Sequence, residues 1–417
     1  MYRWGVFSRR LDWGLGENAL AALEAEKRAA GADILDLTES NPTRVGLTYP
    51  TAAILKAIAQ PGVMHYQPDP RGLPEARAAV AADYARRGAD VHADDIVITA
   101  SSSESYGLLF KVLCDPGDAV LVPEPSYPLF EHLARLEGVQ PVGYRLAHER
   151  ASDGDWPLDF DSIERAAATG RVRAIVVVHP NNPTGSFIGR GELARLVALC
   201  AERSLALISD EVFADYGAEA DISHGAATSE RVGTIAGAAS SALTFSLGGL
   251  SKSCGLPQLK LGWIAAAGPG ALVQAGLARL TFAADAMLSV ATAVQRGLPE
   301  LLAAGAGIRR SIQERVAANR AALIRALPAS SPCTLLRSEG GWSAILRVPA
   351  VCSDEAWALE LLRADDVLCH PGYFFDMPGP GAYLVLSLLP EPARFHRAVA
   401  RVVGRCGGAR VVDAVSR

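Results

Sequence analysis

The sequence lacks the features that mark several classes of protein. Its 417 residues carry 40 basic and 45 acidic side chains, and no block rich in lysine or arginine stands out. A protein that binds nucleic acid through the phosphate backbone carries such a block. The seven cysteines are odd in number and scattered, with no Cys-x-x-Cys pair, which favours reduced thiols over a disulfide framework or a zinc site. We therefore expect no nucleic-acid partner and no bound metal.

Long apolar runs are also missing. The two longest stretches without a charged residue, Val232 to Ser251 and Leu261 to Ala278, are interrupted by serine, glycine, proline or glutamine and are not typical of membrane spans. The N-terminal residues include arginines but no apolar core before a small-residue cleavage site, which argues against a secretory signal. We therefore expect a cytoplasmic protein with no membrane partner.

Short apolar runs dominate the middle of the chain. Half of all residues are hydrophobic, which is typical of a well-buried globular protein, and the length favours two domains. Runs that are apolar throughout are typical of strands buried on both faces. They alternate with helical patterns and occupy residues 95–100, 118–123, 173–180, 205–210, 242–247 and 261–267. A largely parallel α/β sheet is therefore predicted.

The pattern changes near residue 290. Two long helical patterns, Val290 to Ala303 and Ile308 to Leu327, precede short strands near residues 342–348 and 383–388 and a terminal helix. We therefore predict a large domain over residues 51–288 and a smaller α+β domain over residues 289–417. The N-terminal segment 1–50, with a helix from Glu17 to Ala30, is expected to pack with the small domain.

Three polar motifs follow three of the predicted strands. They are His-Pro-Asn-Asn-Pro-Thr-Gly at 179–185, Ser-Asp-Glu-Val-Phe at 209–213, and Ser-Leu-Gly-Gly-Leu-Ser-Lys at 246–252. Open α/β sheets bind ligands at the carboxyl ends of their strands. An amide, a carboxylate and a lysine at that edge match what pyridoxal phosphate needs, namely a Schiff-base lysine, an acid for the pyridine nitrogen and a donor for the ring oxygen.

With these motifs in this order, the chain resembles the fold-type-I pyridoxal-phosphate enzymes of the class I/II aminotransferase family, from about residue 40 to residue 390. The resemblance implies a mostly parallel central sheet in a large domain and a smaller α+β domain. It also implies that Lys252 forms the Schiff base with pyridoxal 5′-phosphate and later moves a proton on the substrate. Asp210 is then expected to pair with the pyridine nitrogen, and Asn182 to bind the ring oxygen.

The resemblance extends to the remaining cofactor contacts. The backbone N–H groups of residues 101–103 are expected to meet the phosphate at a helix N-terminus, and Tyr127 to stack on the pyridine ring. Tyr66 is expected to reach the phosphate of the neighbouring subunit, which implies a homodimer with shared sites. Beside Lys252, Asp210 and Asn182, the expected cofactor-binding residues are Ser101, Ser102, Ser103, Tyr127, Phe213, Ser251, Lys260 and Tyr66.

Two departures from the family pattern concern the cofactor. Phe213 stands where a tyrosine usually donates to the ring oxygen, so we expect the pKa of the Schiff base to be raised relative to a tyrosine-bearing relative. Lys260, eight residues after Lys252, stands where a phosphate-binding arginine is usual and supplies a point charge in place of a planar fork.

A third departure concerns the substrate. Val385 stands where the family has the arginine that clamps the substrate α-carboxylate. Arg44 and Arg347 are the candidates to replace it, and we favour Arg44 because the N-terminal loop borders the site in relatives. Ser40 and Trp342 are also expected to bind substrate, together with Asn182.

The predicted activity is that of an aminotransferase that moves an amino group between an amino-acid donor and a 2-oxo acid. A lyase, cyclase or replacement enzyme acting on an amino acid with the same cofactor is the alternative, because the pocket decides which substrate bond breaks. A regulator that binds the cofactor without turnover is disfavoured, since neither a winged helix nor a basic face is evident.

Overall fold

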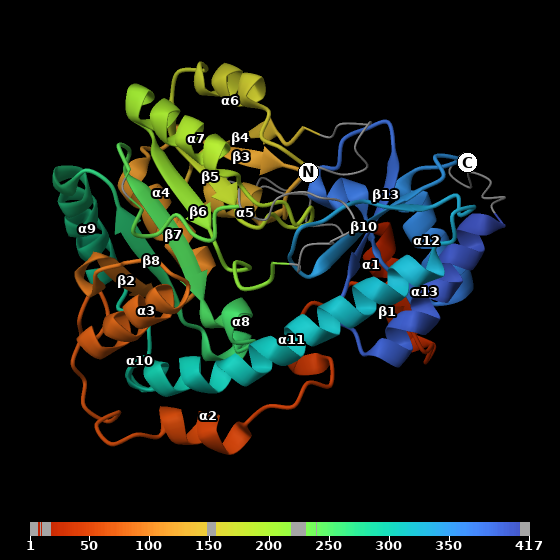
Figure 1. Cartoon of the computed structure of the whole chain (residues 1–417), viewed down its shortest axis with the longest axis horizontal. Helices are drawn as coiled ribbons and strands as arrows, with labels where there is room; N and C mark the ends of the chain where they lie inside the picture. Colours follow the sequence, from red (N-terminus) through yellow and green to blue (C-terminus); the bar gives the residue numbers. More distant parts are fainter. Residues whose placement is uncertain are drawn as a thin grey trace.

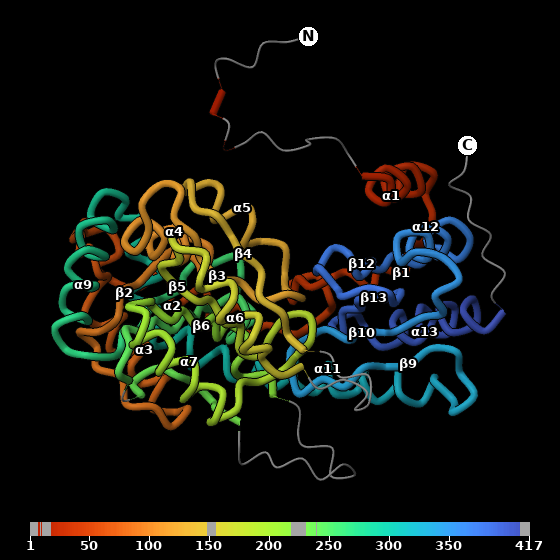
Figure 2. Tube along the Cα trace, turned by 90° about the horizontal axis from the view of Figure 1, so that it is seen from above, coloured from red at the N-terminus to blue at the C-terminus, as the bar shows by residue number. Residues whose placement is uncertain are grey.

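The computed structural model describes residues 7, 8, 10, 18–147, 156–217, 231–238 and 240–408. These residues form two lobes, one built on a seven-stranded sheet and one on a four-stranded sheet (Figure 1). The long helix α11 (Leu298–Ala326) runs along both lobes. Viewed from above, the two lobes lie side by side (Figure 2).

The seven-stranded sheet is mostly parallel, as predicted. Only β8 runs antiparallel to its neighbours β2 and β7, while the pairs from β7 through β6, β5 and β3 to β4 are parallel. In spatial order the strands are β2 (Ile96–Thr99), β8 (Gly262–Ala267), β7 (Thr244–Gly249), β6 (Ala206–Asp210), β5 (Val172–Val178), β3 (Ala119–Glu124) and β4 (Gln140–Arg145). The edge strand β4 was not predicted, because proline, glycine and exposed polar residues interrupt its apolar pattern.

Helices cover both faces of this sheet. On one face α4 (Ser102–Leu113), α5 (Leu129–Leu136) and α9 (Gly270–Asp285) enclose a cluster that includes Phe110 and Phe245. The other face is covered by three further helices, α3 (Pro74–Arg86), α6 (Phe160–Ala167) and α7 (Arg190–Arg203). Helices α2 (Thr51–Ile58) and α10 (Thr292–Arg296) lie beside α11. The central strands are therefore buried on both sides, which explains why their sequences are apolar throughout.

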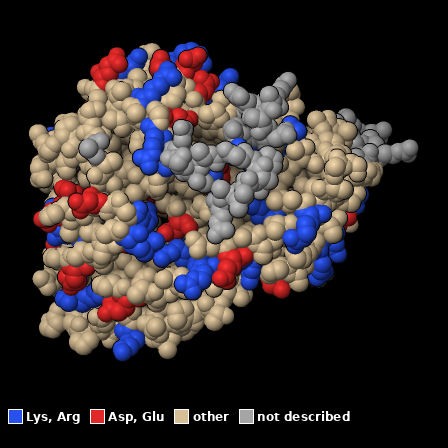
Figure 3. Space-filling view, in the orientation of Figure 1, with Lys and Arg blue, Asp and Glu red and all other residues tan. Residues whose placement is uncertain are grey.

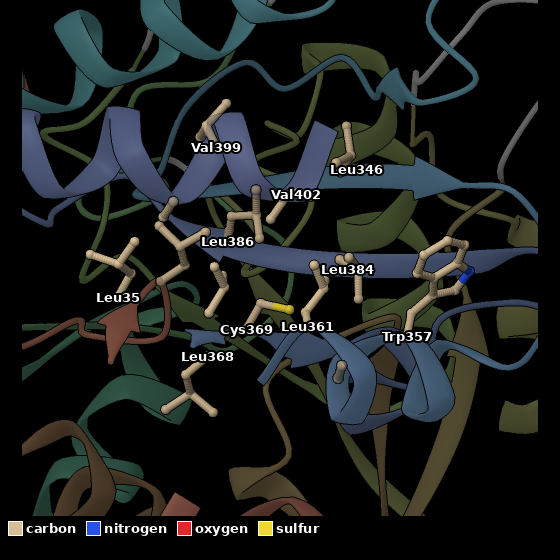
Figure 4. Packing of buried hydrophobic residues seen from close by; sticks show 14 of the residues in the cluster. Leu35, Leu346, Trp357, Leu361, Leu368, Cys369, Leu384, Leu386, Val399 and Val402 are labelled. Carbon is tan, nitrogen blue, oxygen red and sulfur yellow. The ribbon is translucent and has the colours of Figure 1, made fainter. Parts of the chain in front are cut away.

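The smaller lobe is built on an antiparallel sheet. Its strands, in spatial order, are β12 (His370–Pro371), β13 (Ala382–Ser387), β10 (Ser343–Val348) and β9 (Thr334–Leu335). Helices α12 (Asp354–Asp365) and α13 (Pro392–Gly407) pack on it. Leu35, Trp357, Leu384 and Val402 meet in the core (Figure 4).

The N-terminal segment joins this smaller lobe. Helix α1 (Ala19–Ala29) packs on α12, and β1 (Leu35–Asp36) pairs in parallel with β11 (Val367–Leu368). These contacts agree with the expected place of the first helix, while the predicted domain boundaries stay a prediction. No helix among the described residues is both long and apolar enough to cross a membrane. On the face shown in Figure 3, acidic and basic side chains are both scattered.

Helix α11 differs from the prediction of two separate helices. It is continuous across Gly305 and Gly307, where the sequence pattern favours a break. A Cβ at Gly305 would lie 2.4 Å from Sγ of Cys254, so the glycine permits α11 to pack closely against the segment that follows β7. This close approach fixes the position of α8 (Leu250–Ser253), which carries Lys252.

Candidate active site

Lys252 lies in the short helix α8, which begins where β7 ends. Three hydrogen bonds hold this turn in place. Ser253 Oγ donates to the Gly249 carbonyl at 2.8 Å, Arg309 Nη1 donates to the Ser253 carbonyl at 3.1 Å, and Tyr216 OH donates to the Lys252 carbonyl at 2.6 Å. The lysine backbone is therefore anchored to β7, to α11 and to the segment after β6.

The amine of Lys252 is surrounded by aromatic rings. Nζ lies 4.9 Å from the ring centroid of Trp342 and 5.5 Å from that of Phe213. Within the described parts of the chain it forms no hydrogen bond and no ion pair. Burial lowers the pKa of Lys252 to about 8, although Asp210 opposes the shift. A lysine with a lowered pKa has a larger neutral fraction near neutral pH and is a better nucleophile.

Asp210 is the last residue of β6, and its side chain faces α4. Tyr106 OH donates to Oδ2 at 3.0 Å, and the Val212 N–H donates to Oδ1 at 3.1 Å. Burial raises the pKa of Asp210 to about 6, although both hydrogen bonds and Lys252 lower it. No cationic group is hydrogen-bonded to this carboxylate among the described residues, so a bound cation would stabilise its ionised form.

The N-terminus of α4 lies against β8, the strand that pairs with β7 just before Lys252. Ser101 is the N-cap, and its Oγ accepts from the Glu104 N–H at 3.2 Å. A Cβ at Gly262 would lie 3.0 Å from the Ser101 carbonyl carbon and 3.1 Å from the Ser102 nitrogen, so glycine is needed for this approach. The first N–H groups of a helix have no intrahelical partner and attract anions.

Asn182 connects the two lobes. Ser343 Oγ, at the start of β10, donates to Asn182 Oδ1 at 3.2 Å. Nearby, the Gly341 N–H donates to the Tyr216 carbonyl at 2.8 Å. Lys252, Asp210 and Asn182 therefore lie where the carboxyl ends of the large sheet meet the smaller lobe.

Trp342 forms the wall of the site from the smaller lobe. Its ring packs edge-on against Phe213 and Tyr216, with centroids 5.2 and 5.0 Å away. Only 3% of the residue is exposed, and its indole N–H is buried without a hydrogen-bond partner. Most buried donors in proteins have a partner, so this N–H is an exception in the wall of the site.

The other residues predicted for the site lie nearer the surface. Ser102, Ser103 and Ser251 are partly buried. Ser40, Arg44 and Lys260 are exposed, as are Tyr66 and Tyr127, and no hydrogen bond or ring contact among the described residues joins any of them to Lys252. Arg347 lines a separate cavity with Glu124, Arg145, Asp159 and Asp376. The roles proposed for these side chains stay predictions.

Two tyrosines at the site were not predicted. Tyr106 lies four residues after Ser102 and therefore on the same face of α4, a spacing that the sequence makes visible. Tyr216 lies three residues after Phe213, in a turn for which the sequence offers no periodic signal. Both side chains are buried, and each donates to a residue of the predicted set.

Comparison with known proteins agrees with this geometry. Residues 32–386 match the family described as aminotransferase class I and II. The chain belongs to that family. The predicted family and fold type are therefore confirmed.

Several aminotransferases are similar over most of their length. Glutamate-pyruvate aminotransferase AlaA of Escherichia coli (strain K12) is 28% identical over 372 residues, which cover 86% of this chain and 87% of AlaA. Alanine aminotransferase of Mycobacterium bovis is 28% identical over 409 residues, covering 92% of this chain and 86% of the relative. The solved alanine aminotransferase of Pyrococcus furiosus has a TM-score of 0.80 at 25% identity, covering 95% of this chain and 98% of that one. The solved structure of an aminotransferase from Escherichia coli has a TM-score of 0.83 at 24% identity, and the match covers 97% of this chain and 99% of that one.

Proposed function

We propose that this protein is a pyridoxal-5′-phosphate-dependent aminotransferase that moves an amino group between an amino acid and a 2-oxo acid. The observation that carries the proposal is a partly buried lysine amine with no hydrogen-bonding partner among the described residues, near a buried carboxylate, at the carboxyl edge of the sheet. Membership of the aminotransferase family supports the same reaction.

The residues of the site fit pyridoxal phosphate. Lys252 would hold its carbonyl carbon, Asp210 its ring nitrogen and Asn182 its ring oxygen. The first N–H groups of α4, at residues 101–103, would hold the phosphate. When bound, the cofactor supplies an electron-withdrawing ring that stabilises negative charge at the substrate Cα.

Asp210 has the surroundings needed to keep a ring nitrogen protonated. Tyr106 and the Val212 N–H each donate to one of its oxygens and so fix the carboxylate plane. A carboxylate beside a ring nitrogen raises the pKa of that nitrogen, because the opposite charge stabilises the protonated form. Tyr106 is therefore a positioning residue that acts through Asp210.

Lys252 is suited to move the substrate proton. Its free amine would take the proton from the substrate Cα and return it to the cofactor carbon on the other side of the substrate nitrogen, and a pKa of about 8 favours both halves of the transfer near neutral pH. Phe213 and Trp342 line the approach to Nζ with apolar rings and exclude water from it. Phe213 has no hydroxyl to offer, so Asn182 is left as the side-chain donor to the ring oxygen.

The named relatives suggest the substrates to assay first. Their names join glutamate to pyruvate, or specify alanine, so alanine, glutamate and pyruvate are the first candidates here. The lyase or cyclase reading remains the alternative, because the arginine expected at position 385 is absent and the residue there is Val385, only 2% exposed.

We also propose a homodimer that shares its sites. Large apolar side chains are exposed on one region of the large lobe, where Tyr66, Met287 and Leu288 line the same pocket. Met64 and Phe282, near them in sequence, are 92% and 84% exposed. A second copy that covers this region would bury apolar surface and bring Tyr66 toward a partner. A cytoplasmic location stays a prediction from the sequence.

The test is the absorbance of the purified protein with bound cofactor, before and after addition of alanine, glutamate or other amino acids. We expect the visible band to be lost with a suitable donor and to return with pyruvate. Lys252→Ala should abolish both changes, whereas Lys56→Ala, at an exposed position of α2, should not alter them. Release of ammonia without an oxo-acid acceptor would instead identify a lyase, and absence of the band in the wild-type protein would refute the cofactor.

A further inference from the structure

The carboxylate of an amino-acid substrate needs a cation that the usual position does not supply. Val385 packs in a buried apolar cluster with Leu336, Ile345 and Tyr383, so nothing on this part of β13 binds an anion. Two residues later on the same strand face, Ser387 Oγ donates to the Glu39 carbonyl at 2.7 Å, next to Ser40. The N-terminal loop therefore meets β13 directly beside the position of the missing arginine.

Arg320 on α11 is a partly buried cation that has no counter-charge in the part of the chain that the structure describes. Its only hydrogen bond within the described residues runs from Nη2 to the Ser343 carbonyl at 3.4 Å, and no carboxylate there forms an ion pair with it. Burial lowers the pKa of Arg320, and no neighbouring charge opposes the shift. By contrast Arg309, on the same helix, lies 3.7 Å from a carboxylate oxygen of Asp215.

A charge that is partly removed from water without a counter-charge is unfavourable. Moving a guanidinium out of water is offset only where an anion or several hydrogen bonds replace the lost solvation. One long hydrogen bond to a carbonyl leaves most of the five N–H donors of Arg320 unmatched. An anionic ligand would satisfy these donors.

The residue that Arg320 contacts lies at the candidate active site. Ser343 pairs with Ser387 across β10 and β13, and its Oγ donates to Asn182. The preceding residue is Trp342, whose ring faces Lys252 Nζ and whose indole N–H has no partner. From α11, Arg320 therefore contacts the residue that links β10 to Asn182 and that follows Trp342 in the chain.

We propose that Arg320 binds the α-carboxylate of the amino-acid and 2-oxo-acid substrates. The guanidinium matches a carboxylate through two parallel hydrogen bonds. The carboxylate-binding arginine then lies on helix α11 and not on strand β13. The proposal rests on the proposed aminotransferase function, and it assigns the carboxylate to a different arginine from the Arg44 favoured by the sequence.

The test compares substrates that differ only in the carboxylate. Alanine and ethylamine have the same amine and carbon chain apart from the α-carboxylate, so their relative rates of reaction with the bound cofactor measure its recognition. Arg320→Gln should reduce the rate with alanine about 100-fold, as expected when one partner of a buried charge pair is removed, and leave the rate with ethylamine unchanged.

Controls separate a binding role from a structural one. Arg325→Gln, at an exposed position on the same helix, should leave both rates unchanged. Arg320→Lys should retain part of the preference for alanine, and added guanidinium ion should restore part of it to Arg320→Gln. The visible band of the bound cofactor and the melting temperature should persist in each variant, which establishes that the cofactor site is intact.

Three results would overturn the assignment. The first is an equal effect of Arg320→Gln on alanine and ethylamine, and the second is a selective loss for alanine in Arg44→Ala but not in Arg320→Gln. The third is a loss confined to glutamate with alanine unaffected, because Arg320 would then bind a side-chain carboxylate. Failure of the proposed function is distinct from all three, since the wild-type protein would then show no change of the band with any amino acid.

Discussion

Removal of one hydroxyl group tests the role of Tyr106. Its OH donates to Asp210 Oδ2 at 3.0 Å, and neither residue is more than slightly exposed. A hydrogen bond to a charged group contributes roughly 1.5 to 3 kcal/mol. Since one pKa unit corresponds to about 1.4 kcal/mol, Tyr106→Phe should raise the pKa of Asp210 by roughly one to two units. The pKa of Asp210, now raised to about 6, would then move into or above the neutral range.

The assay is a pH titration of the cofactor-free protein, followed by the infrared carbonyl band of a protonated carboxyl group. The difference between each protein and its Asp210→Asn variant isolates the Asp210 signal. Tyr144→Phe is the matched control, because Tyr144 is equally buried but donates to the Val176 carbonyl at 2.9 Å. An unchanged Asp210 titration in Tyr106→Phe, or an equal change in Tyr144→Phe, would refute the reasoning.

Two further predictions concern the packing of α11 and the dimer. Gly305→Ala would place a Cβ 2.4 Å from a sulfur atom, so it should lower the free energy of unfolding by about 1 to 3 kcal/mol and weaken cofactor binding through α8. Gly307→Ala is the control on the same helix, because a Cβ at Gly307 would have no other atom within 4 Å. It should raise the free energy of unfolding by about 0.5 to 1 kcal/mol. Equal free energies of unfolding for the two variants in chemical denaturation would contradict the packing argument. If the subunits share sites, a heterodimer of inactive Lys252→Ala and weakly active Tyr66→Ala contains one site with both native residues, so mixing the two variants should restore activity. No restoration after verified subunit exchange would exclude sharing through Tyr66.

The fold was predictable where burial is uniform. Strands β5, β6 and β7 lie between layers of helices, so their sequences are apolar throughout and their positions follow from composition alone. Strand β4 is at the edge, and its half-exposed residues carry no such pattern. The continuity of α11 depends on tight packing at Gly305, which a residue-by-residue pattern does not contain.

The site was predictable where its residues follow strands. Asp210 ends β6 and Lys252 follows β7, so topology alone brings both to one edge of the sheet. Arg320 and Ser343 belong to elements that pack together only in the folded chain, and the two residues are 23 positions apart in the sequence. Their contact depends on tertiary packing, and so does the lack of a counter-charge near Arg320 among the described residues. The spacing of sequence motifs therefore could not predict either feature.

Because Asp210 and Lys252 have shifted pKa values, we expect the cofactor to stabilise the protein by an amount that depends on pH. Asp210 has a pKa raised from 3.8 to about 6, so folding favours its protonated form. Its favourable contribution to the free energy of unfolding is lost as the pH rises through 6. Lys252 has a pKa lowered from 10.5 to about 8, so folding favours its neutral form, and that contribution is lost as the pH falls through 8. Each shift corresponds to about 3 kcal/mol. Between pH 6 and pH 8 the cofactor-free protein therefore carries both groups in their charged forms in largely buried surroundings.

Bound cofactor should relieve both penalties at once, because Lys252 becomes engaged and Asp210 gains a cationic partner. The increase in melting temperature on addition of pyridoxal phosphate should therefore be largest between pH 6 and pH 8 and smaller at pH 5 and pH 9. In Asp210→Asn the lower limit of this window should disappear, while the fall above pH 8 should remain, since it depends on Lys252 alone. A stabilisation that is constant from pH 5 to pH 9 in the wild-type protein would show that burial of these two groups does not govern cofactor binding.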